Sequence, residues 1–121
     1  MSIGLTQNQQ LSPRTEFREN QDQNVTFKLF PTQNYWTFIK LNTRNGKMWQ
    51  VHFTVEEGGE TGELILNPTS LVESSKETNN RFTLYPTENI YNFMLLDQID
   101  GSVYQVQWSM EKKFRGVAPI Y

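Results

Sequence analysis

Apolar and polar residues alternate in a short segment that occurs twice in the chain. Between Val25 and Phe30 every second side chain is apolar, and Pro31 follows. The segment from Phe82 to Tyr85 repeats this pattern before another proline. A period of two predicts a half-buried strand. Proline ends such a strand, because it has no amide hydrogen to donate to a sheet.

The next apolar run in each half has no polar side. Residues 35–42 read Y-W-T-F-I-K-L-N and residues 90–97 read I-Y-N-F-M-L-L-D, so apolar side chains fall on both faces. Such runs are typical of central strands, although a helix is the rival interpretation for eight residues. Each run leads into a hairpin turn, and this favours the strand.

The two hairpin turns, residues 42–47 and 97–102, have a chemical signature. Each begins with Asn or Asp, whose side chain can accept a hydrogen bond from a backbone amide two residues further on. Asn45-Gly46 and Asp100-Gly101 then supply the positive φ that reverses the chain. We therefore expect both glycines to be structural.

The clearest alternation follows each turn. In the first half we expect the core-facing residues to be Trp49, Val51, Phe53 and Val55, and the solvent-facing residues to be Met48, Gln50, His52 and Thr54. In the second half the corresponding inward set is Tyr104, Val106, Trp108 and Met110, with Val103, Gln105, Gln107 and Ser109 outward. A period of two over this length predicts a strand with one wet face. Residues 63–67 and 114–120 read as fourth strands, and Leu71 and Val72 could anchor a helical turn between the halves.

These parallels reflect an internal duplication. Residues 27–57 align with residues 82–112 at a constant offset of 55 and without a gap. Eleven of the 31 positions are identical, where chance gives roughly two. The identical pairs are Phe27/Phe82, Leu29/Leu84, Pro31/Pro86, Thr32/Thr87, Asn34/Asn89, Phe38/Phe93, Leu41/Leu96, Gly46/Gly101, Gln50/Gln105, Val51/Val106 and Glu56/Glu111.

The sequence therefore predicts an all-β fold built from two repeated antiparallel meanders of three to four strands each. One meander alone leaves an apolar face uncovered, so we expect the two to pack as a pseudo-twofold sandwich or a flattened barrel. Residues 25–121 form a single domain with repeats at 25–68 and 81–121. Residues 1–24 form a polar N-terminal arm, either a tail or a segment that lies across the core, and their composition favours a disordered tail.

Composition narrows the function classes. The chain has no cysteine, which excludes disulfides and thiolate chemistry and suits a cytoplasmic protein. The first residues have neither a basic nor an apolar region of a signal peptide, although a removed one would leave the same sequence. No apolar run is long enough for a membrane span. The net charge of −2 and the lack of a basic stripe argue against nucleic-acid binding.

The turn and the strand after it resemble a known hairpin. The shared string D/N-x-x-D/N-G-x-x-Y/W-Q-V is similar to the hairpin of a β-propeller blade and to short repeats in small bacterial two-repeat β proteins. The resemblance covers the 31 aligned residues of each half. It implies blade-like sheets, and because a propeller usually needs at least four blades, the chain would have to oligomerise or adopt a different fold. It implies no activity.

No reactive constellation is visible, and we expect a non-enzymatic protein without metal or cofactor. Asp97–Gly101 lacks the ligand spacing of a calcium loop and reads as turn chemistry. His52, the single histidine, reads as a surface residue, since no nucleophile motif accompanies it. The acids Glu56, Glu57, Glu60 and Glu63 could support glycosidase chemistry, but they belong to a glycine-rich loop where acids are commonly solvated.

The candidate binding residues are polar and aromatic positions near the repeated turns: Asn34, Tyr35, Trp36, Gln50, Asn89, Tyr91 and Gln105. The two asparagines and two glutamines have a structural interpretation, in which they satisfy loop backbone and bridge strands. Alternatively, amides beside aromatic rings could line a groove for a sugar or an extended peptide. The leading hypothesis is a module for protein–protein interaction or self-assembly, possible as a homo-oligomer through exposed strand edges. The alternative is carbohydrate or small-ligand binding between the repeats.

Overall fold

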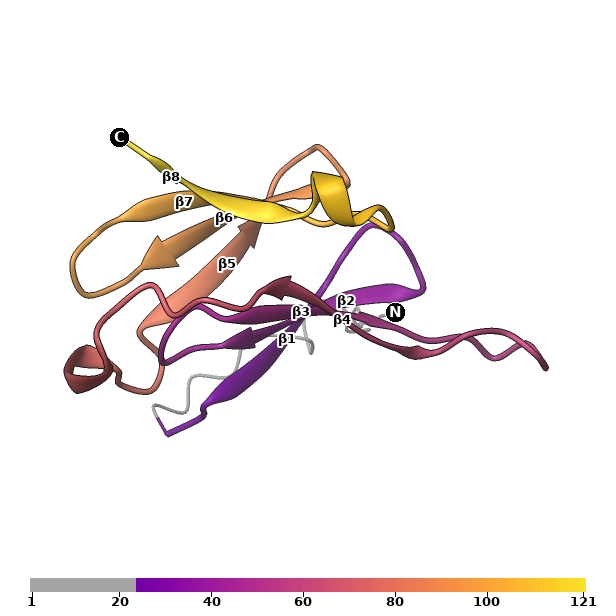
Figure 1. Ribbon diagram of the computed structural model, residues 1–121, viewed down its shortest axis with the longest axis horizontal. Helices are drawn as coiled ribbons and strands as arrows, with labels where there is room; N and C mark the ends of the chain where they lie inside the picture. Colours follow the sequence, from indigo (N-terminus) through magenta and orange to yellow (C-terminus); the bar gives the residue numbers. More distant parts are fainter. Residues whose placement is uncertain (1–23) are drawn as a thin grey trace, which may run out of the picture.

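The computed structural model describes residues 24–121, so the predicted arm lies outside the described residues apart from Asn24. The described chain folds into two four-stranded antiparallel sheets, stacked one above the other in Figure 1. This confirms the predicted all-β class and the sandwich of two meanders, and the sheets do not close into a barrel.

Each repeat forms one sheet. The first sheet consists of β1 (Phe27–Pro31), β2 (Thr37–Asn42), β3 (Met48–His52) and β4 (Gly62–Asn67). The second sheet consists of β5 (Phe82–Pro86), β6 (Asn92–Asp97), β7 (Val103–Gln107) and β8 (Gly116–Ile120). Two short 3₁₀ helices, η1 (Ser74–Lys76) and η2 (Lys112–Phe114), lie in the connections. Leu71 and Val72, predicted to anchor a helical turn, instead precede η1 and pack against the core.

The strand register is the same in both sheets, as the duplication requires. Phe27 pairs with Asn42 in the first sheet, and Phe82 pairs with Asp97 in the second. The pairing between the second and third strands also keeps the offset of 55. The fourth strands correspond at an offset of 54, because the turn into β8 is one residue shorter.

The repeated turns form with the predicted chemistry. In the first, the side-chain oxygen of Asn42 accepts from the Arg44 amide at 2.9 Å. In the second, Asp97 accepts from the Ile99 amide at 2.9 Å. Gly46 and Gly101 have φ values of 85° and 83°, in the left-handed region that favours glycine.

Each sheet has two distinct faces. The aromatic face carries an aromatic residue at four repeated positions: Phe27/Phe82, Phe38/Phe93, Trp49/Tyr104 and Phe53/Trp108. The glutamine face carries Ile39/Met94, Leu41/Leu96, Met48/Val103 and Gln50/Gln105. Because the register is conserved between repeats, each face of one sheet has its counterpart in the other.

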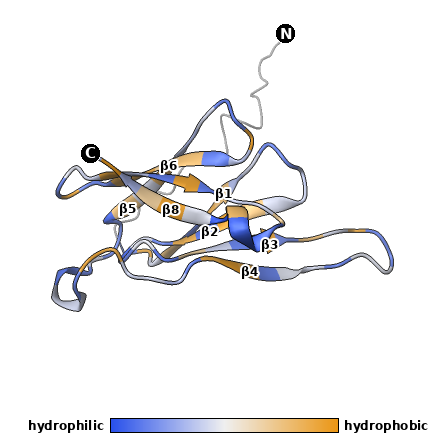
Figure 2. Ribbon diagram, turned by 45° about the horizontal axis from the view of Figure 1, so that its top comes forward, coloured by the Kyte–Doolittle hydropathy of each residue, from blue (hydrophilic) through white to orange (hydrophobic). Residues whose placement is uncertain are grey.

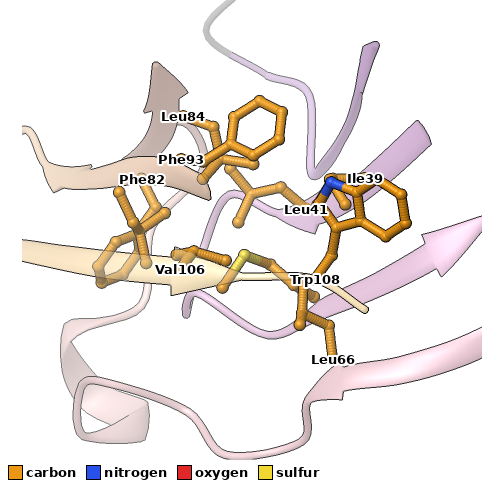
Figure 3. Close-up of a cluster of buried hydrophobic side chains, with 10 residues drawn as sticks. Ile39, Leu41, Leu66, Phe82, Leu84, Phe93, Val106 and Trp108 are labelled. Atoms are coloured by element: carbon orange, nitrogen blue, oxygen red, sulfur yellow. The ribbon is translucent and has the colours of Figure 1, made fainter. Parts of the chain in front are cut away.

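The two sheets bury opposite faces. The first sheet contributes its glutamine face to the core, where Ile39, Leu41 and Met48 are fully buried. The second contributes its aromatic face, with Phe82, Phe93 and Trp108 buried. Figure 3 shows these side chains meeting between the sheets. The core thus joins a glutamine face to an aromatic face.

This arrangement corrects the predicted orientation of β3. Trp49, Val51, Phe53 and Val55 were expected in the core, but they lie on the outer side, where Val55 is exposed, while Met48 and Gln50 are buried. The expectation for the second repeat is correct for Val106 and Trp108 and wrong for Met110, which is exposed.

The symmetry of the sandwich also differs from the twofold expectation. A twofold axis places the same patch of both partners in the interface. Here each patch meets a different one, so the repeats are related head to tail. Gln33 of the first repeat donates its side-chain amide to the Thr87 carbonyl at 3.3 Å, which places the corresponding loops of the two repeats side by side.

The connection between the sheets carries a buried ion pair. Arg81 Nε donates to the two carboxylate oxygens of Asp97 at 3.0 and 2.9 Å, and both side chains are almost fully buried. The Phe82 amide donates to the Thr43 carbonyl at 2.8 Å. These contacts fix the start of β5 against the first sheet.

Candidate functional site

Gln50 links the two sheets at the centre of their interface. Its side chain is fully buried, its Nε2 donates to the Ser109 carbonyl at 3.0 Å, and its Oε1 accepts from the Ser109 amide at 3.1 Å. Arg115 Nε donates to the same carbonyl at 2.8 Å. A glutamine expected to face solvent therefore acts as a polar bridge in the core.

His52 lies beside this bridge and not on the open surface. Gln50 Nε2 is 3.1 Å from His52 Nε2, and the Thr37 hydroxyl is 3.1 Å from His52 Nδ1. An Nε2 atom that accepts from an amide belongs to a neutral ring with its proton on Nδ1. Burial, and secondarily the positive charge of Arg115, lower the pKa of His52.

In the part of the chain that the structure describes, the aromatic face of the first sheet has no partner sheet, and it is partly exposed. Phe27 is 52% and Phe53 39% exposed. The rings of Phe27 and Trp49 lie 6.2 Å apart, and those of Trp36 and Phe53 lie 5.2 Å apart. Ordered, exposed aromatic rings on one sheet face are characteristic of an interaction surface.

One ion pair lies on this same face. Lys40 Nζ is 2.7 Å from a Glu63 carboxylate oxygen. Its ammonium also lies 5.0 Å from the centre of the Trp49 ring. The charge of Lys40 is therefore balanced and packed against an aromatic ring. An apolar partner could cover this face without leaving that lysine unpaired.

Within residues 24–121, the glutamine face of the second sheet likewise has no partner sheet. Gln105, Ala118 and Ile120 are exposed there, and Met94 and Leu96 are half-buried. A hollow of about 230 Å³ opens on this face. Its lining includes Asn92, Gln105, Gln107, Gly116 and Ala118, together with residues 113–115.

A second hollow lies between the repeats, where their loops meet. Its volume is about 480 Å³, and its lining includes Pro31, Gln33, Pro86 and Asn89. Both proline–threonine loops contribute, so this hollow is the nearest structural equivalent of the groove predicted between the repeats.

The repeated asparagines are structural. Asn34 Oδ1 accepts from the Trp36 amide at 2.8 Å, and Asn89 Oδ1 accepts from the Tyr91 amide at the same distance. The hydroxyl of the preceding threonine bonds the asparagine carbonyl in both loops. The repeated Pro-Thr-x-Asn string therefore specifies one turn twice.

The remaining predicted binding residues are distributed over different surfaces. Tyr35 is exposed at the entry to β2, and Trp36 stacks edge-on against Phe53. Tyr91 packs against the buried Trp108, with ring centres 5.0 Å apart. Gln105 lines the hollow of the second sheet, whereas its counterpart Gln50 is buried.

Three of the four acidic candidates lie in one exposed loop, and the fourth, Glu63, pairs with Lys40. Glu56, Glu57 and Glu60 are exposed in the loop between β3 and β4, which projects from the body of the protein in Figure 1 and Figure 2. Within residues 24–121, no three His, Cys, Asp or Glu side chains are placed to hold a metal ion. The carboxylate of Asp97 bonds Arg81, and this supports a turn and not a calcium loop.

Sequence reasoning missed the two uncovered faces. A signal was available, because the apolar residues at both Phe38/Phe93 and Ile39/Met94 mark two apolar faces in each repeat. Two sheets packed through one face each leave two such faces free. No helix of the described chain is long and apolar enough to cross a membrane.

Comparison with models of known protein families, with curated proteins and with solved structures finds no match for this chain. The functional conclusion therefore depends on the geometry of these surfaces.

Proposed function

We propose that the protein is a non-enzymatic module that acts by protein–protein association, primarily with itself. The observation that carries this proposal is the aromatic face of the first sheet, where Phe27, Leu29 and Ile65 are each more than half exposed. In a monomer these aromatic and aliphatic residues stay in contact with water. An interface that buries them is stabilised by about 25 cal/mol for each Å² of apolar surface removed from water.

Association with a second copy is the leading form of this proposal. The chain already contains one interface in which such an aromatic face is covered, namely the one inside its own sandwich. A cover of matching shape is therefore encoded in the same sequence. We place the module in the cytoplasm as part of this proposal, because a chain without cysteine needs no oxidising compartment to fold.

The test is the mass of the protein in solution across a wide concentration range, measured by sedimentation and light scattering. We expect wild type to form a species larger than 14.2 kDa. Phe53→Glu places a charge on the aromatic face and is expected to weaken association. Ile99→Glu alters a more exposed apolar residue, in a turn outside both faces, and it is the control. A protein that stays monomeric throughout would refute self-association.

A second candidate function is binding of a sugar or small ligand, favoured by the hollow between the repeats. That hollow presents the side-chain amides of Gln33 and Asn89 beside two prolines. Backbone amide shifts of residues 31–33 and 86–90 in nuclear magnetic resonance spectra, recorded with a panel of mono- and oligosaccharides, test it. Unchanged shifts at high sugar concentration would dismiss this candidate.

A further inference from the structure

We infer that copies of this chain associate head to tail, the glutamine face of the second sheet in one copy covering the aromatic face of the first sheet in the next. This inference rests on the proposed self-association and specifies its partner surface. In effect, the contact between copies repeats the contact between the two sheets of one copy.

The first support is that the interface inside one copy joins two different faces and therefore has a direction. The two sheets have the same strands and register but bury opposite faces. A heterologous interface of this kind uses two different patches, so each sheet retains one unused face and the two unused faces differ in type. In this chain the first sheet keeps a free aromatic face and the second keeps a free glutamine face.

The second support is the chemical match between used and unused faces. On the unused aromatic face of the first sheet, six residues match their counterparts on the buried aromatic face of the second sheet. The pairs are Phe27/Phe82, Leu29/Leu84, Phe38/Phe93, Trp49/Tyr104, Val51/Val106 and Phe53/Trp108. The unused glutamine face repeats the buried one through Met94/Ile39, Leu96/Leu41, Val103/Met48 and Gln105/Gln50. Each of these ten pairs keeps its apolar, aromatic or amide character, so at these positions the free faces have the chemistry of an interface already formed.

The third support is the hollow on the second sheet. Its lining residues Asn92, Gln105, Gln107, Gly116 and Ala118 correspond by register to Thr37, Gln50, His52, Gly62 and Leu64. On the first sheet this place is covered. The ring of Trp108 lies 6.4 Å from that of His52, and Ser109 bonds Gln50. The hollow is therefore the open counterpart of a filled position.

The residues that would fill the hollow are present on the first sheet. Phe53 and Thr54 are the counterparts of Trp108 and Ser109. Phe53 is 39% exposed, and the loop that follows it projects from the body of the protein (Figure 1). In the assembly Phe53 of one copy enters the hollow of the next, and Gln105 bonds the backbone of Thr54 as Gln50 bonds Ser109.

Lys40 and Glu63 are the main differences between the two interfaces, because their counterparts in the second sheet are the apolar residues Leu95 and Val117. The ion pair between Lys40 and Glu63 keeps these charges balanced when the face is covered. Covering an ion pair still removes it from water, which costs free energy that an aliphatic residue does not require. The contact between copies is thus weaker than the internal contact and reversible.

A head-to-tail contact either closes into a ring or continues as a filament. Propeller-like rings hold about four to eight four-stranded sheets, so about two to four copies of this two-sheet chain would complete one. A closed ring leaves neither face exposed.

The test uses two full-length variants that each block one face. Phe53→Glu blocks the aromatic face, and Gln105→Glu blocks the glutamine face at an exposed side chain that does not affect folding. Each variant alone is expected to be monomeric, with association weakened by roughly 100-fold. Because each variant retains the face that the other has lost, an equimolar mixture is expected to form a one-to-one dimer and nothing larger.

The outcomes separate this inference from the proposed function. Monomeric wild type refutes both. Wild type that assembles, with Gln105→Glu assembling equally well, indicates that aromatic faces pair with each other and overturns only the head-to-tail inference. Two monomeric variants that do not combine overturn it as well. The Ile99→Glu control should assemble like wild type.

Discussion

Replacing Gln50 with leucine removes a side chain that hydrogen-bonds from one sheet to the other. Leucine fills much of the same space, so the change tests the polar bridge more than the packing. In the folded protein Gln50 holds the Ser109 amide at 3.1 Å and the Ser109 carbonyl at 3.0 Å. It also bonds the His52 ring.

The expected loss follows from which groups keep a partner. The Ser109 carbonyl retains its bond from Arg115, but the Ser109 amide loses Gln50 Oε1. Ser109 is half-buried, and a donor shielded from water and left without an acceptor costs about 1–3 kcal/mol. We therefore expect Gln50→Leu to lower the free energy of unfolding by about 2 kcal/mol. With a denaturant slope of about 1–3 kcal/mol per molar urea, the midpoint falls by about 1 M.

The duplication supplies a matched control. Gln105 occupies the same position in the second sheet but is exposed in the single chain, so Gln105→Leu should change the free energy of unfolding by less than about 0.5 kcal/mol. Both changes are best made in the Phe53→Glu background, where association does not contribute to the transition. Urea unfolding followed by tryptophan fluorescence measures both.

Equal effects at the two positions would show that Gln50 is not specifically engaged between the sheets. A loss below about 0.5 kcal/mol for Gln50→Leu would show that water replaces the amide at no cost. Either result would contradict the placement of Gln50 as the polar bridge.

Three further predictions concern stability. Asp97→Asn removes the buried carboxylate that Arg81 contacts at 2.9 Å and leaves its charge only the partly exposed Asp100 carboxylate at 3.6 Å, so it should cost about 3 kcal/mol in urea unfolding. Gly46→Ala should destabilise more than Gly101→Ala in thermal unfolding, because both strain a positive φ but only at position 46 does the new methyl meet a side chain, at 2.7 Å. The lowered pKa of His52 means that the unfolded chain binds a proton more readily than the folded chain, so stability falls as the pH drops through about 6.5, and His52→Gln should remove that part of the pH dependence.

Much of the architecture could be predicted because the relevant interactions are local. The turns at Asn42 and Asp97 can be recognised in the sequence, because each begins with a side-chain oxygen acceptor and contains a glycine. The structure contains both turns. The offset of 55 also fixes which strands pair and in what register. Turn chemistry and repetition do not require knowledge of the partner sheet.

The orientation of β3 could not be predicted, because alternation gives a period and not its direction. Trp49 and Val51 make one side of the strand apolar, and Met48 supplies the other. Which side is buried depends on the sheet that covers it, and this is a tertiary contact distant in sequence. For the same reason the burial of Gln50 could not be predicted. A glutamine in the core is stable only because the Ser109 backbone lies opposite its side-chain amide.

For the candidate binding residues, too, local contacts could be predicted from the sequence and tertiary contacts could not. Asn34 and Asn89 were interpreted correctly as turn residues, since their partners lie two positions away. Trp36 and Tyr91 were expected to share a groove, yet each packs against a ring of its own sheet. Aromatic side chains find partners through the fold, so their sequence positions alone do not reveal a common surface.

The head-to-tail packing of the sheets bears on how the duplicated gene diverged. Each repeated position meets different surroundings in the two halves. Leu95 is fully buried in the core, whereas its counterpart Lys40 is only half-buried. Two such positions can change independently, which is consistent with a cation and an aliphatic residue at equivalent places in the two halves.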